Sequence, residues 1–411
     1  MSPFQPLNLP NGQTIANRIA KAAMEENLAD TQQAPSKGLL RLYQAWAEGD
    51  AGLLLTGNVM IDRRAMTGPG GVVLEDERHL ERFRQWATTG RAGGAQFWVQ
   101  LNHPGRQTMA NLGQQAWAPS AVALDLGSFS KMFAEPKPMT ESDINEVIQR
   151  FANSAALAQK AGFTGVQIHA AHGYLLSQFL SPLTNRRTDQ WGGSLENRAR
   201  LLLTVVSAVR KAVSPQFCVS VKLNSADFQR GGFDADDAKQ VILWLNEQHI
   251  DLLELSGGSY EAPAMQGEAR DGRTLAREAY FLEMAGELAS VARMPVMVTG
   301  GIRRLAIVEH VLDSGIAMAG IGTAMAVEPH LVKHWREGKN SHPQLPPIHW
   351  KRKPLAALAT MAVVKFQLHR LSRGHQPRPQ VSALWALIRD QLYIAKRTRQ
   401  YKHAMAMAMA K

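Results

Sequence analysis

The chain lacks several features that would decide its class at once. Cys218 is the only cysteine among 411 residues, so no intramolecular disulfide can form and a reducing compartment is favoured. No run of about 18 apolar, uncharged residues occurs, which argues against a transmembrane helix. The first residues have neither a basic start nor an apolar core, so we expect no secretory signal and a cytoplasmic location.

The net charge is unevenly spread along the chain. The whole sequence carries 46 Lys and Arg against 35 Asp and Glu. Residues 341–411 hold 13 of these basic residues and a single acid, Asp390, which gives a net charge of +12. Residues 1–340 keep 33 basic and 34 acidic residues, a net charge of −1. We therefore predict a neutral domain over residues 1–340 and a basic C-terminal tail over residues 341–411.

Short apolar runs alternate with longer segments of helical periodicity. Eight runs read as buried strands: Ile19–Ala23, Gly52–Val59, Gln96–Leu101, Gly165–His169, Cys218–Leu223, Leu252–Leu255, Val296–Thr299 and Ala317–Ile321. A helical pattern follows each: Lys37–Glu48, Glu77–Ala92, Glu141–Ala161, Ser194–Ala212, Ala235–Gln248, Ala276–Ala292, Leu305–Asp313 and Pro329–Arg336. Eight strand–helix units predict a closed (β/α)8 TIM barrel. An open doubly wound sheet would carry a GxGxxG turn after its first strand, and the chain has none.

Three long connections follow predicted strands, where barrel active sites form. They are Asn102–Met139, Ala170–Gly193 and Ser256–Thr274. Glycine turns follow the last two strands, Gly300–Gly301 after the seventh and Gly320–Gly322 after the eighth. Glycines let backbone N–H groups approach an anion, and this pair of strands commonly holds a phosphate in barrels. Ordinary tight turns are the alternative.

Two polar residues are predicted at strand ends that face the barrel mouth. Gln100 ends the third strand and Lys222 ends the fifth. An amide and an ammonium in an apolar barrel need partners. A flavin ring offers donors and acceptors to the amide, and a cation near its N1 and O2 atoms would stabilise the anionic reduced ring. Alternatively, Lys222 pairs with a carboxylate such as Asp227 or Glu254.

His169, His172 and Tyr174 lie within six residues at the end of the fourth strand. Two imidazoles can hold a carbonyl or nitro oxygen and polarise a conjugated double bond. A phenol, with an ordinary pKa of about 10, can protonate the carbanion that develops. A zinc site would need a third ligand, and His103 could serve only through folding. Structural histidines bonded to backbone carbonyls are the other alternative. We predict a substrate site with no metal.

The segment His169–Arg198 resembles the signature of the old yellow enzymes, the NADH:flavin oxidoreductase family of FMN-binding barrels. Further matches follow in the family's order, at Asn17–Ile19, Gln100–Arg106, Val298–Gly301 and Gly320–Gly322. The resemblance covers about residues 1–340 and implies a non-covalent FMN that is reduced by NADH or NADPH. It also implies a small electrophilic acceptor such as an enone, enal or nitroalkene.

The resemblance implies a role for each candidate residue. His169 and His172 would hold the acceptor, and Tyr174 would protonate its α-carbon while flavin N5 gives hydride to the β-carbon. The residues implied to contact FMN are Ala23, Met24, Glu25, Gly57, Gln100, Lys222, Gly300, Gly301, Gly322 and Thr323. The family's longer members carry an iron–sulfur site and a second flavin domain. With one cysteine and 411 residues in this chain, we expect neither.

Three positions depart from the family pattern. Glu25 stands where the family usually has threonine or cysteine near flavin N5 and O4. Our hypothesis is that Glu25→Gln raises the flavin midpoint potential, because an ionised carboxylate disfavours the anionic reduced ring. Lys222 and Thr323 each stand where arginine is more usual, and Arg303 or Arg304 could replace the arginine at the phosphate.

The basic tail contains a proline-rich linker, His342–Trp350, and two helical patterns, Pro354–Leu371 and Val381–His403. Three interpretations remain open: a helical hairpin packed on the barrel or on a second subunit, a basic amphipathic anchor on a membrane surface, and nucleic-acid binding, which no known motif accompanies.

The sequence thus favours an FMN-dependent NAD(P)H oxidoreductase of ene-reductase type. One alternative is the same fold acting as an NADH oxidase or oxidative demethylase. An alternative of another class is a membrane- or partner-binding protein that acts through the basic tail.

Overall fold

Eight parallel strands close into a barrel in the computed structural model, which describes residues 1–262 and 282–409. They are β3 (Ile19–Lys21), β4 (Leu53–Met60), β6 (Gln96–Asn102), β9 (Gly165–Ala170), β10 (Cys218–Asn224), β11 (Leu252–Ser256), β12 (Val296–Thr299) and β13 (Met318–Ile321). Each pairs with the next, and β13 pairs with β3 to close the ring. The predicted TIM barrel is confirmed, with each strand within two residues of its expected bounds.

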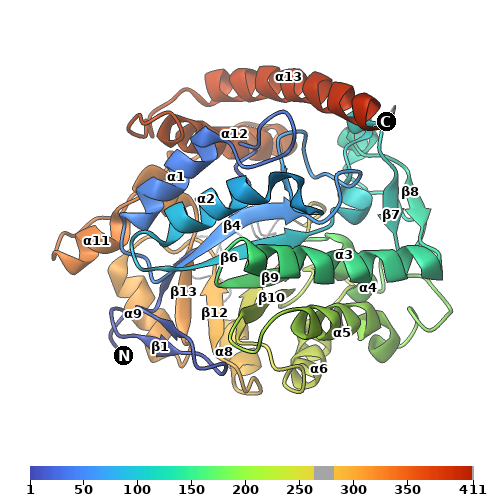
Figure 1. Cartoon of the computed structure of the whole chain (residues 1–411), viewed down its shortest axis with the longest axis horizontal. Helices are drawn as coiled ribbons and strands as arrows, with labels where there is room; N and C mark the ends of the chain where they lie inside the picture. The colour runs from blue at the N-terminus through green and yellow to red at the C-terminus, as the bar shows by residue number, and fades with distance from the viewer. Residues whose placement is uncertain (263–281, 410–411) are drawn as a thin grey trace.

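Helices surround the ring (Figure 1). Those that follow the barrel strands are α1 (Lys37–Ala47), α2 (Leu80–Arg91), α3 (Glu141–Lys160), α5 (Leu195–Ala212), α6 (Ala235–Leu245), α8 (Leu282–Ala289), α9 (Leu305–Asp313), α10 (Thr323–Val327) and α11 (Leu331–Arg336). Of the predicted helix Ala276–Ala292, residues 276–281 lie outside the described residues. Side-chain oxygens of Thr140 and Ser194 cap α3 and α5 by accepting backbone N–H groups three residues on.

The half of the barrel interior that lies toward the amino ends of the strands is apolar. It is filled by inward-facing residues of the strands: Ala20, Leu53, Leu55, Trp98, Cys218, Leu252, Met297 and Met318. A hairpin of β1 (Leu7–Asn8) and β2 (Thr14–Ile15) packs against this cluster. Burial raises the pKa of the Cys218 thiol to about 12, so this cysteine is an unreactive part of the core.

Several short elements lie in the connections. They are β5 (Val72–Val73), α4 (Leu175–Leu180), and short 3₁₀ helices at Glu77–His79, Gly105–Gln107, Ala110–Leu112 and Gly127–Met132. Within the long connection after β6, β7 (Ala116–Ala118) and β8 (Pro136–Pro138) pair in parallel. These elements give the rim of the barrel a fixed shape that the sequence pattern did not reveal.

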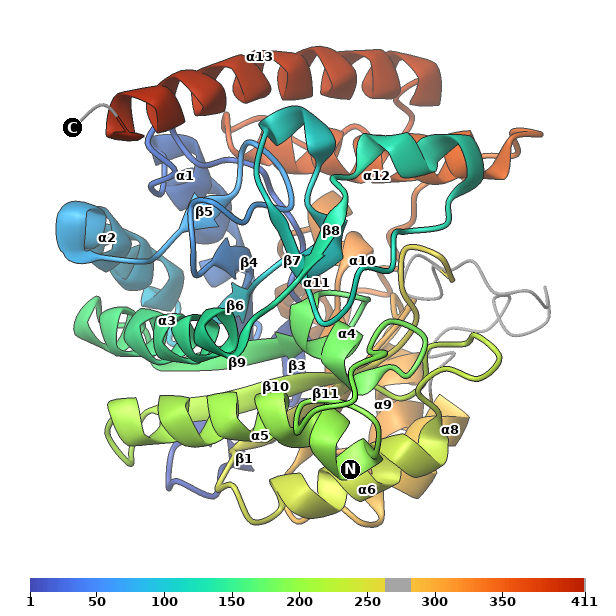
Figure 2. The same ribbon diagram turned by 90° about the vertical axis from the view of Figure 1, so that its right-hand side faces the viewer.

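The basic tail folds into α12 (Lys353–Leu371) and α13 (Ala383–Met409), which pack on each other at one edge of the barrel (Figure 2). Arg397 donates to the carbonyls of Ala29 and Asp30, and the Tyr401 hydroxyl donates to the carbonyl of Arg63. The tail therefore docks on the barrel of its own chain, as the first interpretation expected. No helix within residues 1–262 and 282–409 is long and apolar enough to cross a membrane.

Candidate active site

A layer of polar side chains lies in the barrel interior, nearer to the carboxyl ends of the strands than the apolar half described above. Gln100 donates to Gln167 at 2.8 Å, and Gln167 donates to Glu254 at 2.7 Å. Glu254 is fully buried, pairs with Lys222 at 2.9 Å and accepts a hydrogen bond from Thr299 at 2.7 Å. The layer joins five neighbouring strands, from β6 to β12, into one network in which the charges of Lys222 and Glu254 balance.

Strand register explains why these residues meet. Gln100 pairs with Gln167, and Lys222 lies between His169 on one side and Glu254 on the other. The sequence predicted Gln100 and Lys222, and left Glu254 open as a partner of Lys222; the structure contains that ion pair. Gln167 was missed, although its place two residues before His169 put it on the same inward face of the strand.

His169 and His172 lie side by side at the end of β9, with ring centroids 5.0 Å apart. Nδ1 of His169 accepts the backbone N–H of Ala171 at 3.3 Å, which places the ring proton of the neutral imidazole on Nε2. Nε2 of His172 lies 2.8 Å from Oγ of Ser256. The His172 backbone has a φ of 60° and donates its N–H to Asn224, so the turn after β9 is fixed by β10 and β11.

Both imidazoles are neutral near pH 7. Burial holds the pKa of His169 and of His172 well below the usual value, and the positive charge of Lys222 lowers both further. The ring of His103 has other contacts: its Nδ1 accepts the N–H of Gly105, and the ring stacks on Trp117. Among the described residues, no group of three or more His, Cys, Asp or Glu is arranged to hold a metal ion.

Tyr174 is buried directly before α4, and its ring lies edge-on to His169 at 4.9 Å. Its hydroxyl lies 3.0 Å from the hydroxyl of Tyr260. Burial raises the pKa of Tyr174 well above 10, and the phenol of Tyr260 and the carboxylate of Glu25 raise it further, so the phenol is protonated at neutral pH. Tyr260 was missed because it lies in the long connection after β11, where no periodicity orients a side chain.

The segment after β3 carries Ala23, Met24 and Glu25 along the barrel mouth, where it is locked to the bulge in β4. Gly57 lies in that bulge and donates its N–H to Glu26 at 2.9 Å. A Cβ on Gly57 would lie 2.1 Å from Oε2 of Glu26 and 2.3 Å from the Met24 carbonyl. Only glycine therefore permits this close approach of β4 to Met24 and Glu26.

A buried polar cluster supports the same segment from the outside of the barrel. Tyr43 of α1 donates to Glu26, and Lys21 donates to Tyr43 at 3.2 Å and to the Leu55 carbonyl at 2.6 Å. Burial lowers the pKa of Lys21 to about 8, with Glu26 opposing it. The sequence prediction missed these residues because Lys21, Glu26 and Tyr43 come from separate elements.

The two glycine turns lie at the ends of neighbouring strands, β12 and β13. Gly301 has a φ of 67°, in the left-handed region that favours glycine. Gly322 lies directly before α10 and Thr323 begins it, and a Cβ on Gly322 would lie 3.9 Å from Met24. The turns and the segment after β3 therefore meet at one side of the mouth. Arg303 is half-buried and Arg304 is exposed.

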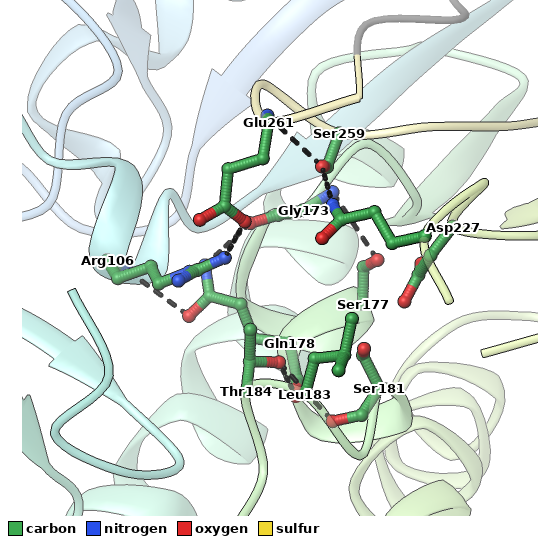
Figure 3. Close-up of a pocket in the computed structure, with 11 residues that line it drawn as sticks. Arg106, Gly173, Ser177, Gln178, Ser181, Leu183, Thr184, Asp227, Ser259 and Glu261 are labelled. Carbon is green, nitrogen blue, oxygen red and sulfur yellow. Dashed lines mark hydrogen bonds and ion pairs between the residues drawn. The ribbon is translucent and has the colours of Figure 1, made fainter. Parts of the chain in front are cut away.

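A small pocket, partly open to solvent, lies behind the His172–Tyr174 turn (Figure 3). Arg106 is buried in its wall and pairs with Glu261 at 2.5 Å, while Gln178 donates to the Gly173 carbonyl at 2.7 Å. The lining side chains thus bond mainly to one another and to the backbone of the turn. We interpret the side chains that line this pocket as part of the support that holds Tyr174 in place.

The described residues fit FMN. The polar layer offers an amide donor, acceptors and one cation to the edge of a flavin ring, and two glycine turns at adjacent strand ends suit a phosphate. His169, His172 and Tyr174 lie beside this layer because β9 is the neighbour of both β6 and β10. One face of the mouth is thus suited to a cofactor and another to a polarised acceptor.

Comparisons with known proteins identify a family and several similar proteins. Residues 2–342 match the family model described as the NADH:flavin oxidoreductase / NADH oxidase family. The chain is 38% identical to the NADH-dependent flavin oxidoreductase iliE of Neonectria sp. (strain DH2), over 80% of this chain and 46% of that protein. It is 37% identical to the NADH-dependent flavin oxidoreductase nadA of Aspergillus parasiticus, over 79% of this chain and 76% of the relative.

A solved structure shares the fold. An old yellow enzyme homologue from Zymomonas mobilis superposes with a TM-score of 0.72 at 24% identity, covering 85% of this chain and 95% of that one. The chain spans less than half of the length of the Neonectria relative but most of this structure. Residues 343–411, which are nearly all of the tail, lie beyond the region that the family model matches.

Proposed function

Because the chain belongs to the NADH:flavin oxidoreductase / NADH oxidase family, that of the old yellow enzymes, we propose that it reduces an activated carbon–carbon double bond. The family binds FMN, and its members use NADH or NADPH. The observation that carries the proposal is the convergence of His169, His172 and Tyr174 beside the polar layer of the barrel. The acceptor that suits them is an enone, enal or nitroalkene.

A bound FMN would supply the hydride transfer between the nicotinamide and the acceptor. We propose that Gln100 and Lys222 hold the edge of its ring and that Ala23, Met24 and Glu25 flank it, with Gly57 supporting Met24 from behind. The phosphate would be held by Gly300, Gly301, Gly322 and Thr323, together with Arg303 or Arg304. Lys222 stays paired with Glu254, so its charge is already oriented before the cofactor arrives.

Each residue of the acceptor site has a separate task. The proton on Nε2 of His169 suits donation to an acceptor oxygen, since Nδ1 is occupied by the Ala171 N–H. His172 is held by Ser256 and provides the second contact. Neutral imidazoles polarise the acceptor without protonating it. Tyr174, kept protonated by burial, gives its proton to the α-carbon.

An absorption spectrum of the purified protein under nitrogen tests this proposal. We expect flavin bands that bleach when NADH or NADPH is added and return when an enone is added. Return only with oxygen would favour the alternative of an NADH oxidase or oxidative demethylase. A colourless protein that FMN does not reconstitute would contradict the proposed function.

A second candidate function concerns the outer face of α13. Leu384, Trp385, Ile388 and Leu392 are 58%, 55%, 44% and 68% exposed, although the opposite face of this helix packs on the barrel and on α12. Farther along the helix the exposed residues include Lys396, Arg399 and Lys402. An exposed apolar stretch followed by a basic one complements an anionic lipid surface. We propose that α13 contacts such a membrane peripherally.

Sedimentation with lipid vesicles tests this contact. We expect the chain to bind vesicles that contain phosphatidylserine, and the double variant Trp385→Ser/Leu392→Ser to lose about tenfold or more in affinity, because it removes apolar area from the lipid contact. Neutral vesicles and the unchanged flavin spectrum of the variant are the controls. Equal binding by both proteins would contradict the proposal, as would a dimer in light scattering that the same substitutions dissociate.

A further inference from the structure

A lysine of the C-terminal tail reaches the segment that we assign to the cofactor. Lys365 lies in α12, beyond the last residue of the family match, and its side chain is 12% exposed. Its Nζ lies 3.4 Å from Oε2 of Glu25. Glu25 is one of the positions that depart from the family pattern, so the unusual carboxylate and the extension beyond the family region meet in one ion pair.

The tail also contacts the backbone of the two residues that follow Glu25. Nε2 of His369 on α12 lies 3.2 Å from the carbonyl oxygen of Glu26. The hydroxyl of Tyr393 on α13 donates to the carbonyl of Asn27 at 2.7 Å. Both helices of the hairpin therefore hold residues 25–27 directly, and the position of Lys365 opposite Glu25 is fixed by backbone contacts that do not depend on the ion pair.

Glu25 is linked on its other side to the tyrosines of the acceptor site. Oγ1 of Thr67 donates to Oε1 of Glu25 at 2.7 Å, and Nδ2 of Asn58 donates to the same Oγ1 at 3.4 Å. Asn58 in turn acts on Tyr174, whose pKa it lowers slightly against the larger effect of burial. The charge of Glu25 acts on both Tyr174 and Tyr260 and raises the pKa of each, after burial.

The charge state of Glu25 depends on the tail. Burial acts to raise its pKa, but Lys365, Thr67 and Asn27 outweigh burial and leave the pKa lowered. Burial acts to lower the pKa of Lys365, but Glu25 and then Asp390 of α13 outweigh it. Within residues 1–262 and 282–409, the titratable groups coupled to Glu25 are thus Lys365, Asp390, Tyr174 and Tyr260, and Lys365 is the cation among them.

We propose that Lys365 is a positioning residue of the active site, which keeps Glu25 ionised and neutralised beside the cofactor and the Tyr174–Tyr260 pair. The C-terminal extension then sets the electrostatics of the cofactor face, through a pair with no net charge. The effect on the cofactor rests on the proposed function. The effect on the ionisation of Glu25 is independent of it.

The midpoint potential of the bound FMN tests the first effect, measured from pH 5.5 to 8.5 against reference dyes. Glu25→Gln leaves Lys365 without its partner and should raise the potential at every pH. Lys365→Met should match the unsubstituted protein at low pH, where Glu25 takes up a proton. As pH rises and Glu25 ionises without a neighbouring cation, the equilibrium constant for reduction of FMN in Lys365→Met should fall by about tenfold. The double variant Lys365→Met/Glu25→Gln is neutral at every pH and should restore the original potential, as should Lys365→Arg alone.

Thermal unfolding without the cofactor tests the second effect. In the unsubstituted chain, the lowered pKa of Glu25 contributes stability above the unfolded pKa of about 4.3. In Lys365→Met burial raises that pKa, so this variant should become less stable relative to the original chain as pH rises from 5 to 8, by at least about 2 °C. Adding Glu25→Gln should remove this pH dependence.

A merely structural role of Lys365 predicts other results. If Lys365 only anchors α12, Lys365→Met should lower the melting temperature equally at all pH values, Glu25→Gln should not rescue it, and the potentials should be unchanged; these results would overturn the proposal. Failure of the unsubstituted chain to bind FMN would instead refute the proposed function, while the unfolding experiment still decides the role of Lys365.

Discussion

Replacement of Tyr174 by phenylalanine is expected to slow reoxidation of the reduced protein by an enone about 10²- to 10⁴-fold, the usual contribution of a positioned general acid. Its hydroxyl is the proton donor that we assign to the α-carbon, and burial keeps it protonated. Reduction by NADH should be unchanged, because no proton from Tyr174 is needed there. Rapid mixing of each half-reaction measures the two rates separately.

Tyr260 provides the matched control, because its hydroxyl lies 3.0 Å from that of Tyr174. Tyr260→Phe should slow reoxidation much less, since it removes only the hydrogen bond to the proton donor. The double variant should be as slow as Tyr174→Phe or slower. An unchanged rate in Tyr174→Phe, with the loss appearing in Tyr260→Phe, would transfer the proton donation to Tyr260.

Replacement of Lys222 by methionine is expected to lower the free energy of unfolding by about 3–5 kcal/mol, the usual cost of leaving one charge of a buried pair without its partner. Glu254 is fully buried, and its hydrogen bonds from Gln167 and Thr299 are made to an ionised carboxylate. Urea unfolding of the protein without cofactor measures the loss. We also expect weaker FMN binding, because the cation in the polar layer is gone.

The double variant Lys222→Met/Glu254→Gln separates the effect on stability from the effect on FMN binding. Neutral glutamine can keep hydrogen bonds to its neighbours, so stability should largely return while FMN binding stays weak. Lys222→Arg, which places the family's more usual residue there, should keep both. Full recovery of FMN affinity in the double variant would show that Lys222 serves only to balance Glu254.

The barrel, and the strand ends that carry the candidate site, could be predicted because both follow from local pattern. Buried parallel strands are short apolar runs, and eight of them alternate with amphipathic helices. Alternation along a strand fixes which residues face inward, so Gln100, His169 and Lys222 could be placed at the mouth before any contact was known. The segment His169–Tyr174 needed only its position at a strand end.

The sequence could not single out the partners of these residues, because pairing is set by neighbours that are far apart in the sequence. It left both Asp227 and Glu254 open as the partner of Lys222. Glu254 lies 32 residues from Lys222 and meets it through the register of β10 and β11. Tyr260 comes from a long connection without periodicity. The close packing of Gly57 against Glu26 and Met24 could not be predicted either, because it depends on how the segment after β3 meets the bulge in β4.

The tail shows most clearly which features follow from the sequence and which depend on the tertiary structure. Composition by itself determined that residues 341–411 are basic and contain two helices, because charge and periodicity are properties of the local sequence. Only the tertiary structure decided that Lys365 turns inward to Glu25 while Leu384 and Trp385 stay exposed. A helix presents every direction in turn, and the choice of its buried face depends on the surface it meets, which here is built by residues more than 300 positions earlier in the chain.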